Sequence, residues 1–223
     1  MISIIIPALN EEKALPGTLA GTFTHPGNFE VIVVDGGSAD RTREIARADP
    51  RVRLVVARRG RAAQMNAAAR LARGEWLLFL HADTLLPADG LARIAELPAE
   101  VAAGCFRHRF SGDDWRLRFV SWLDNYRCER TRVMYGDQAM FVRRGLFERL
   151  GGFPDVEILE DVVLSERLGA LTRPILIDDA VVTDSRKFVQ KGVFRSLLRC
   201  CAILLCYGLR LPIPARSFFH PVR

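Results

Sequence analysis

Polar and acidic side chains follow three apolar stretches of the chain, at the point where each stretch ends. Residues 2–6 lead into Pro7-Ala8-Leu9-Asn10-Glu11, residues 31–34 into Asp35-Gly36-Gly37-Ser38, and residues 76–80 into His81-Ala82-Asp83. Near-continuous apolar strands are typical of a parallel sheet that is covered on both faces, and open α/β sheets bind ligands beyond the carboxyl ends of their strands. We therefore expect these side chains to meet at one sheet edge, where a nucleotide, a metal ion and a second substrate could bind.

Each of these residues also has a purely structural explanation. Asn10 and Glu11 could cap a helix and favour its dipole. Gly36 lets the backbone approach a ligand while Asp35 accepts hydrogen bonds from a base or ribose, but the following Ser38 could simply be a helix cap. Asp83 is either a turn residue or a carboxylate that holds a hard divalent cation beside a diphosphate. No G-x-G-x-x-G loop is present, which disfavours a dinucleotide site.

The elements that must position these residues alternate between strand and helix in the first half of the chain. The pattern predicts strands at 2–6, 31–34, 53–57 and 76–80, and helices at 11–24, 40–48, 62–72 and 87–97. The second half predicts strands at 104–110, 139–143 and 174–177, and helices at 115–126, 145–150 and 161–168. This βαβ order predicts an α/β fold with a mostly parallel sheet and helices on both faces.

Composition limits the functional class. The chain has 223 residues and a net charge of +6, and nearly all its positive charge comes from Arg, which suits phosphate or carboxylate partners. The Arg residues are scattered, with no basic run interleaved with aromatics, so nucleic acid is not an expected partner. Five Cys residues without C-x-x-C spacing indicate reduced thiols, and no signal peptide precedes the first strand; both favour a cytoplasmic protein.

The chain becomes basic and then apolar after Asp184. We expect residues 1–184 to form the main domain and residues 185–223 to be a helical appendage of that domain. Residues 191–210 mix apolar and basic side chains and are too short in their apolar part for the ~20 residues of a spanning helix. They could pack on their own domain, on a partner subunit, or on the inner face of a membrane with anionic lipids.

Taken in order, the motifs resemble the inverting glycosyltransferases of family 2, which have the GT-A fold. The resemblance runs from residue 2 to about residue 184. It includes the Pro7–Glu11 loop, the segment Asp35-Gly36-Gly37-Ser38-x-Asp40-x-Thr42, residues 60–66, Gly74-Glu75 before the Asp83 strand, and Glu160-Asp161 after Gly151-Gly152-Phe153. Each motif is weak alone, and their order and spacing make the resemblance specific.

The resemblance implies roles for individual residues. The nucleoside pocket would include Pro7, Ala8, Asn10, Glu11 and Asp35, with Gly36, Arg61 and His81 beside it. Asp83 matches the last carboxylate of the family's D-x-D metal motif, which implies Mn²⁺ or Mg²⁺, and Asp161 matches the general base. Asp137, Gln138, Glu160 and Arg186 are candidates for contacts with the sugar or the acceptor.

Two departures from the family pattern affect the predicted nucleotide and metal contacts. Gly36 stands where the family commonly has a second Asp, so the nucleotide base is open. His81 replaces the first Asp of D-x-D, so it could ligate the metal, bind phosphate, or do neither. Val163 stands where relatives often have another acid, which leaves fewer acidic groups around Asp161.

The predicted reaction is metal-dependent transfer of a sugar, with inversion, from a nucleoside-diphosphate sugar, most simply a UDP-sugar, to an unknown hydroxyl acceptor. The leaving diphosphate gains negative charge, which a metal and Arg or Lys can stabilise, and the acceptor hydroxyl needs a carboxylate to take its proton. An alternative keeps the fold but not the chemistry: a nucleotide-binding protein with a sensing or scaffold role. A nucleotidyltransferase is disfavoured, because it would be expected to have a Gly-rich basic loop directly after the first strand.

Overall fold

A computed structural model describes residues 1–213. Eight strands form one mixed sheet in the order β3-β2-β1-β4-β7-β6-β8-β5. The strands are β1 (Ile2–Ala8), β2 (Phe29–Asp35), β3 (Val52–Val56), β4 (Trp76–Phe79), β5 (Thr84–Leu85), β6 (Ala103–Phe110), β7 (Phe141–Arg143) and β8 (Ile175–Thr183). The first four strands in space pair in parallel, as do β6 and β8, while β7 and β5 pair antiparallel with their neighbours.

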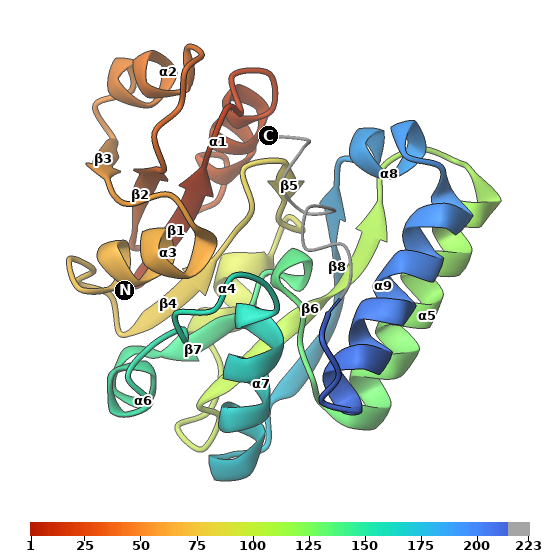
Figure 1. Ribbon diagram of the computed structural model, residues 1–223. Coiled ribbons are helices and arrows are strands. Elements are labelled where there is room, and N and C mark those ends of the chain that lie inside the picture. Colours follow the sequence, from red (N-terminus) through yellow and green to blue (C-terminus); the bar gives the residue numbers. More distant parts are fainter. Residues whose placement is uncertain (214–223) are drawn as a thin grey trace.

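Helices cover both faces of this sheet (Figure 1). They are α1 (Leu15–Thr22), α2 (Thr42–Ala48), α3 (Arg61–Ala69), α4 (Gly90–Ala95), α5 (Trp115–Thr131), α6 (Arg144–Arg149), α7 (Glu160–Leu171), α8 (Arg186–Gln190) and α9 (Val193–Gly208), with a 3₁₀ turn at Gly136–Gln138. The predicted α/β class, with a mostly parallel sheet between two helical layers, is confirmed.

The core is divided by the sheet into two apolar clusters. All of β1 is buried, and because successive side chains of a strand point to opposite faces, Ile5 packs with α3, α6 and α7 while Ile4 and Ile6 pack with α1, α2 and α4. Burying a strand on both faces favours apolar residues at most positions, which explains the near-continuous apolar runs of β1, β2 and β4. Ser3 is the buried exception in β1, and its Oγ donates to Glu30 at 2.6 Å.

Several element boundaries differ from those expected. The helix after β1 starts at Leu15 rather than at residue 11, because Pro16 fits only in a first turn. β8 runs to Thr183 although Asp178 and Asp179 interrupt its apolar pattern; a register shift opposite Arg107 accommodates them, and Arg107 pairs with Asp178 at 2.7 Å. The two-residue strand β5 was not predicted.

The segment after β8 folds back over the sheet edge as α8 and α9, and α9 lies beside α5 (Figure 1). Within residues 1–213, no helix has both the length and the apolarity to cross a bilayer. The last ten residues of the predicted 185–223 appendage fall outside the described residues, and the division at residue 184 stays a prediction. None of the five Cys residues, all of which lie in the described part, forms a disulfide.

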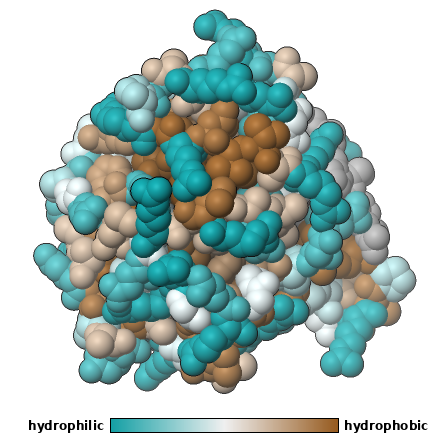
Figure 2. Space-filling view, turned by 90° about the vertical axis from the view of Figure 1, so that its left-hand side faces the viewer, coloured by the Kyte–Doolittle hydropathy of each residue, from teal (hydrophilic) through white to brown (hydrophobic). Residues whose placement is uncertain are grey.

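Hydrophilic side chains dominate one side of the molecule. Figure 2 shows the side that carries β3 and α2, where hydrophilic residues surround a smaller hydrophobic patch.

Candidate active site

The loops after β1 and β2 are tied together by side-chain hydrogen bonds. Asn10 receives the backbone N–H of Ala39 on its Oδ1 at 2.8 Å, and its own N–H donates to Ser38 Oγ at 2.9 Å. The N–H of Glu11 donates to Thr42 Oγ1 at 2.8 Å. The Asp35–Thr42 segment thus fixes the shape of the Pro7–Glu11 loop, and Asn10, a predicted nucleotide contact, is part of that bracing.

Asp35 lies behind the loop rather than in an open cleft. Its carboxylate is completely buried and accepts hydrogen bonds from the N–H groups of Gly37 and Ser38 and from Arg43 Nε, the last at 2.6 Å. Burial alone would raise the pKa of Asp35, but the hydrogen bonds from Ser38, Arg43 and Gly37 outweigh it and hold the pKa below its ordinary value. Asp35 is therefore a charged brace of the β2 loop, and a contact with the nucleotide stays a prediction.

Gln64 of α3 explains the glycine at position 36. The buried amide Nε2 of Gln64 donates to the carbonyl oxygens of Ala8 at 2.9 Å and Val34 at 2.7 Å, which links the ends of β1 and β2. A Cβ atom on Gly36 would lie 2.9 Å from the Gln64 side chain, closer than van der Waals contact allows. At position 36 the family commonly has an Asp. In this chain the space that such a side chain would need is occupied by Gln64 of α3.

Two carboxylates converge on one ammonium group at the sheet edge. Lys187 Nζ, from α8, lies 2.8 Å from Glu11 Oε1 and 3.0 Å from Asp83 Oδ2. Burial would raise the pKa of Asp83, but the charge of Lys187 outweighs it and lowers that pKa, while Asp83 and Glu11 raise the pKa of Lys187 against the opposing effect of burial. The two carboxylates already hold a cation between them, so this donor set fits a divalent metal.

His81 is a half-buried imidazole beside these charges. Burial, reinforced by the charge of Arg61, lowers the pKa of His81 to about 4. A Cβ atom on Gly136 would meet His81 Nε2 at 2.9 Å and Asp161 Oδ2 at 3.2 Å, so Gly136 allows its backbone to pass between them. At neutral pH His81 can offer a nitrogen lone pair or one N–H, but not a positive charge.

The two acidic residues at the start of α7 have different surroundings. Glu160 is 3% exposed and its Oε1 pairs with Arg61 Nε at 2.6 Å. Asp161 is less buried, and its Oδ2 accepts the N–H of Gly136 at 2.7 Å. Leu159, just before them, has a φ of 61°, a left-handed conformation that costs a non-glycine residue of order 1–3 kcal/mol and turns α7 toward the site. Glu160 is engaged in a buried ion pair, whereas Asp161 faces an open cavity.

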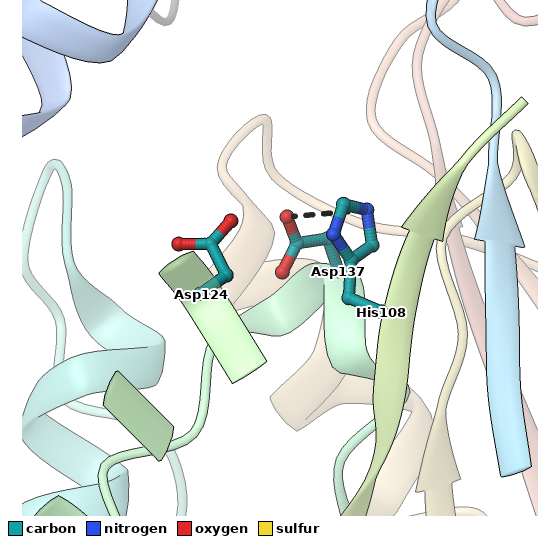
Figure 3. Close-up of side chains that lie close together, drawn as sticks. All are labelled: His108, Asp124 and Asp137. Atoms are coloured by element: carbon teal, nitrogen blue, oxygen red, sulfur yellow. Dashed lines mark ion pairs between the residues drawn. The ribbon is translucent and has the colours of Figure 1, made fainter. Parts of the chain in front are cut away.

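Asp137 belongs to a cluster that the sequence did not predict. The Oδ2 atom of Asp137 lies 3.9 Å from Nε2 of the buried His108, and Asp124 of α5 is near both (Figure 3). Burial, together with the charge of Asp137, raises the pKa of Asp124 to about 7. One ligand atom from each of these residues lies within 4.8 Å of the others, close enough to share an ion, but Asp83 is not part of this cluster.

Two cavities meet at these residues. The first, which we call the strand-edge cavity, is lined by Pro7, Ala8, Glu11, Asp83 and Lys187. The second, the helix-walled cavity, is lined by Asp161 and by apolar residues of α5 and α9. Arg61, His81 and Asp137 line both. A ligand in the strand-edge cavity could therefore extend to Arg61, His81 and Asp137. On the other side of these three residues lies Asp161, in the helix-walled cavity.

Other predicted site residues lie at the margin. Arg186 is exposed and pairs with Asp184 at 2.6 Å, while its neighbour Lys187 enters the site. Gln138 is completely buried, and its Oε1 accepts the N–H of Tyr135 at 3.0 Å, which shapes the turn that carries Asp137. The contacts that we predicted for Arg186 and Gln138 with sugar or acceptor stay predictions.

The sequence did not indicate Gln64, His108 and Asp124 as site residues. Lys187 was considered only in the basic pair Arg186-Lys187, which could lie over the diphosphate or form a solvated basic loop. Gln64 had a usable signal, because it is a polar residue within a helix of small apolar residues whose inner face is buried. Lys187 is 176 residues from Glu11 in the chain and 104 from Asp83, so no local pattern indicates that they meet.

Comparison with known proteins identifies the class that this fold and site define. Residues 3–151 match the family described as Glycosyl transferase family 2. The chain belongs to glycosyltransferase family 2.

Two curated relatives illustrate the range of similar proteins. A PGL/p-HBAD biosynthesis glycosyltransferase of Mycobacterium tuberculosis is 39% identical over 166 residues, covering 69% of this chain and 63% of the relative. An undecaprenyl-phosphate 4-deoxy-4-formamido-L-arabinose transferase of Pseudomonas aeruginosa is 29% identical over 167 residues, covering 67% of this chain and 49% of the relative. This chain therefore spans about half to two thirds of the length of these relatives.

Solved structures confirm the GT-A-like fold. The mannosyltransferase PcManGT of Pyrobaculum calidifontis, solved in complex with GDP-Man and Mn²⁺, matches with a TM-score of 0.71 and 25% identity, covering 98% of this chain and 68% of that one. TarS of S. aureus in complex with UDP-GlcNAc matches with a TM-score of 0.66 and 19% identity, covering 92% of this chain and 66% of that one.

Proposed function

We propose that this chain transfers a sugar, with inversion, from a nucleoside-diphosphate sugar to a hydroxyl acceptor, and that the donor is a UDP-sugar. The observation that carries the proposal is the meeting of two cavities at Arg61, His81 and Asp137. One cavity has paired carboxylates and a lysine suited to a metal diphosphate. The other is lined by Asp161, whose two carboxylate oxygens are oriented by the N–H groups of Gly136 and Val162. Single displacement needs these two functions on opposite sides of the sugar.

The leaving group would bind in the strand-edge cavity. Asp83 and Glu11 would hold Mn²⁺ or Mg²⁺, which supplies charge neutralisation for the diphosphate when bound. Lys187, now between the two carboxylates, and Arg61 would add positive charge where negative charge develops. The complex of PcManGT with GDP-Man and Mn²⁺ supports a nucleotide sugar bound together with a metal ion in a chain of this fold.

Asp161 would act as the general base. The hydrogen bond from Gly136 orients its carboxylate, and the adjoining cavity gives an acceptor hydroxyl access to it. Glu160 is the less suitable base because its carboxylate is 4% exposed and paired with Arg61. Glu160 would instead position Arg61.

Nucleotide binding tests this proposal directly. Calorimetric titrations with UDP and GDP, each in Mn²⁺ and in EDTA, should show UDP binding that weakens at least tenfold in EDTA, and Asp83→Asn should abolish that metal effect. Preference for GDP would contradict the uridine assignment. Binding of neither nucleotide would contradict the proposed function, and UDP binding that ignores both EDTA and Asp83→Asn would remove the metal assignment.

A further inference from the structure

The helix-walled cavity has a character unlike that of the strand-edge cavity. Its volume is about 230 Å³, and most of its wall is apolar. The apolar lining comes from four separate parts of the chain: Leu123 of α5, Tyr135, Val162 of α7, and Leu197, Ile203 and Leu204 of α9. An apolar cavity of 150 Å³ in another protein admits benzene, so this one is large enough for an aromatic ring with a short substituent.

The wall formed by α9 is anchored at both ends. Near its start, Val193 is buried with Phe110, Leu117 and Val120. Near its end, Ile203 is buried with Ile158, Leu159 and Val162. Because these two clusters fix the helix over the sheet edge, its middle turns span the cavity instead of filling it. The cavity is thus a built feature of the fold between two packed clusters.

Four polar residues of this cavity lie at its border with the strand-edge cavity: Arg61, His81 and Asp137, which line both cavities, and Asp161. Asp124 and Arg127 of α5 also line the helix-walled cavity. Arg127 lies flat on the ring of Tyr135, with its guanidinium carbon 3.4 Å from the ring centroid. A ligand would therefore meet a carboxylate at one end and mainly hydrocarbon and aromatic surface along its length.

We propose that the acceptor is a phenol or aryl alcohol whose ring occupies the helix-walled cavity and whose hydroxyl faces Asp161. This inference rests on the proposed transfer reaction and specifies its acceptor. A sugar acceptor fits less well, because any of its hydroxyl groups that lay against Leu123, Leu197 or Leu204 would lose water without gaining a hydrogen-bond partner. In the step itself, the acceptor oxygen forms a bond to the anomeric carbon, the bond from that carbon to the diphosphate oxygen breaks, and Asp161 receives the hydroxyl proton.

Neighbouring leucines of α9 provide a matched test. Leu197 lines the cavity, whereas Leu198 is 70% exposed on the outer side of the helix. Binding of 4-propylphenol, measured by saturation-transfer NMR titration, should weaken about tenfold in Leu197→Ser and stay unchanged in Leu198→Ser. Leu197→Trp, which keeps the wall apolar but fills the space, should also block binding, and glucose should not bind to any variant.

UDP titration of the same proteins separates the two proposals. If every variant binds UDP but 4-propylphenol binds nowhere, or binds Leu197→Ser and Leu197→Trp as well as the unmodified chain, the acceptor inference is overturned and the proposed function stands. The same holds if glucose binds in competition with 4-propylphenol. If UDP does not bind the unmodified chain, the proposed function itself fails.

Discussion

At the residue scale, the charged side chains of the site are held in place by ion pairs with one another. Lys187 is the clearest case, because its ammonium lies where Glu11 and Asp83 would hold a metal ion. Replacing Lys187 by Met removes the competing cation, so the free protein should bind Mn²⁺ about tenfold more tightly. The measurement is a calorimetric Mn²⁺ titration without nucleotide.

Arg186→Met is the matched control for that experiment. Arg186 is adjacent in the chain but pairs with Asp184 instead. Its removal should leave the affinity for free Mn²⁺ unchanged. Equal affinities in the unmodified chain, Lys187→Met and Arg186→Met would show that Glu11 and Asp83 do not form the cation site.

Asp35 gives a pH-dependent prediction. The folded state lowers the pKa of Asp35 from its ordinary value of 3.8, so the ionised carboxylate stabilises the fold above that value and the contribution is lost as the pH falls through the lower, folded-state pKa. Asp35→Asn should reduce the free energy of unfolding by about 1.5–3 kcal/mol at pH 7, the range for hydrogen bonds to a charged group. Urea unfolding at pH 7 and pH 3 should show this difference shrinking at the lower pH, and a difference that is constant or grows would contradict the account.

At the element scale, the contact of α3 with the ends of β1 and β2 explains a departure from the family pattern. Gly36→Ala should lower the free energy of unfolding by about 1–3 kcal/mol, because the new Cβ would displace the Gln64 amide, which donates two hydrogen bonds. Gln64→Ala should also destabilise the fold. The double variant should be more stable than the sum of the two single effects predicts, as a double-mutant cycle by chemical unfolding would show; additive effects would mean that the two residues do not compete for the same space.

The predictability of the elements follows from the range of the interactions that form them. The doubly buried strands β1, β2 and β4 were predictable because burial on both faces leaves a continuous apolar run. β5 has two residues and forms only by pairing with β8, which is distant in the sequence, so no local pattern predicts it. The predicted site residues Pro7, Glu11 and Asp83 follow strand ends, whereas Lys187 and Asp124 reach the site from helices placed by distant packing.

At the scale of the whole molecule, α5 and α9 together expose an apolar surface beside the helix-walled cavity. On α5, Trp122 stacks between Phe119 and Tyr126, and Trp122 is 58% exposed. On α9, Phe194 contacts Trp115 of α5 with ring centroids 6.0 Å apart. A membrane contact of residues 191–210 is one of the three alternatives considered for them. It would involve both helices, with aromatic rings at the lipid surface.

Vesicle binding tests this alternative. Vesicles containing anionic lipid should bind the protein and neutral vesicles should not, and binding should fall in high salt because basic residues of α9 supply part of the attraction. Trp122→Ser with Phe194→Ser should weaken binding several-fold in a flotation assay. Absence of binding to anionic vesicles, or binding unaffected by the double substitution, would leave these helices as a surface without a membrane role.

The central claim is that Asp161 takes the acceptor proton in a sugar transfer. The most direct measurement is the transfer rate of Asp161→Asn with the donor sugar identified for the unmodified chain. Because Asn keeps the shape but not the basicity, kcat should fall by about 10²–10⁴-fold while UDP affinity stays within about twofold. Undiminished transfer in Asp161→Asn, with loss in Glu160→Gln at unchanged UDP affinity, would contradict the account and place the base on Glu160.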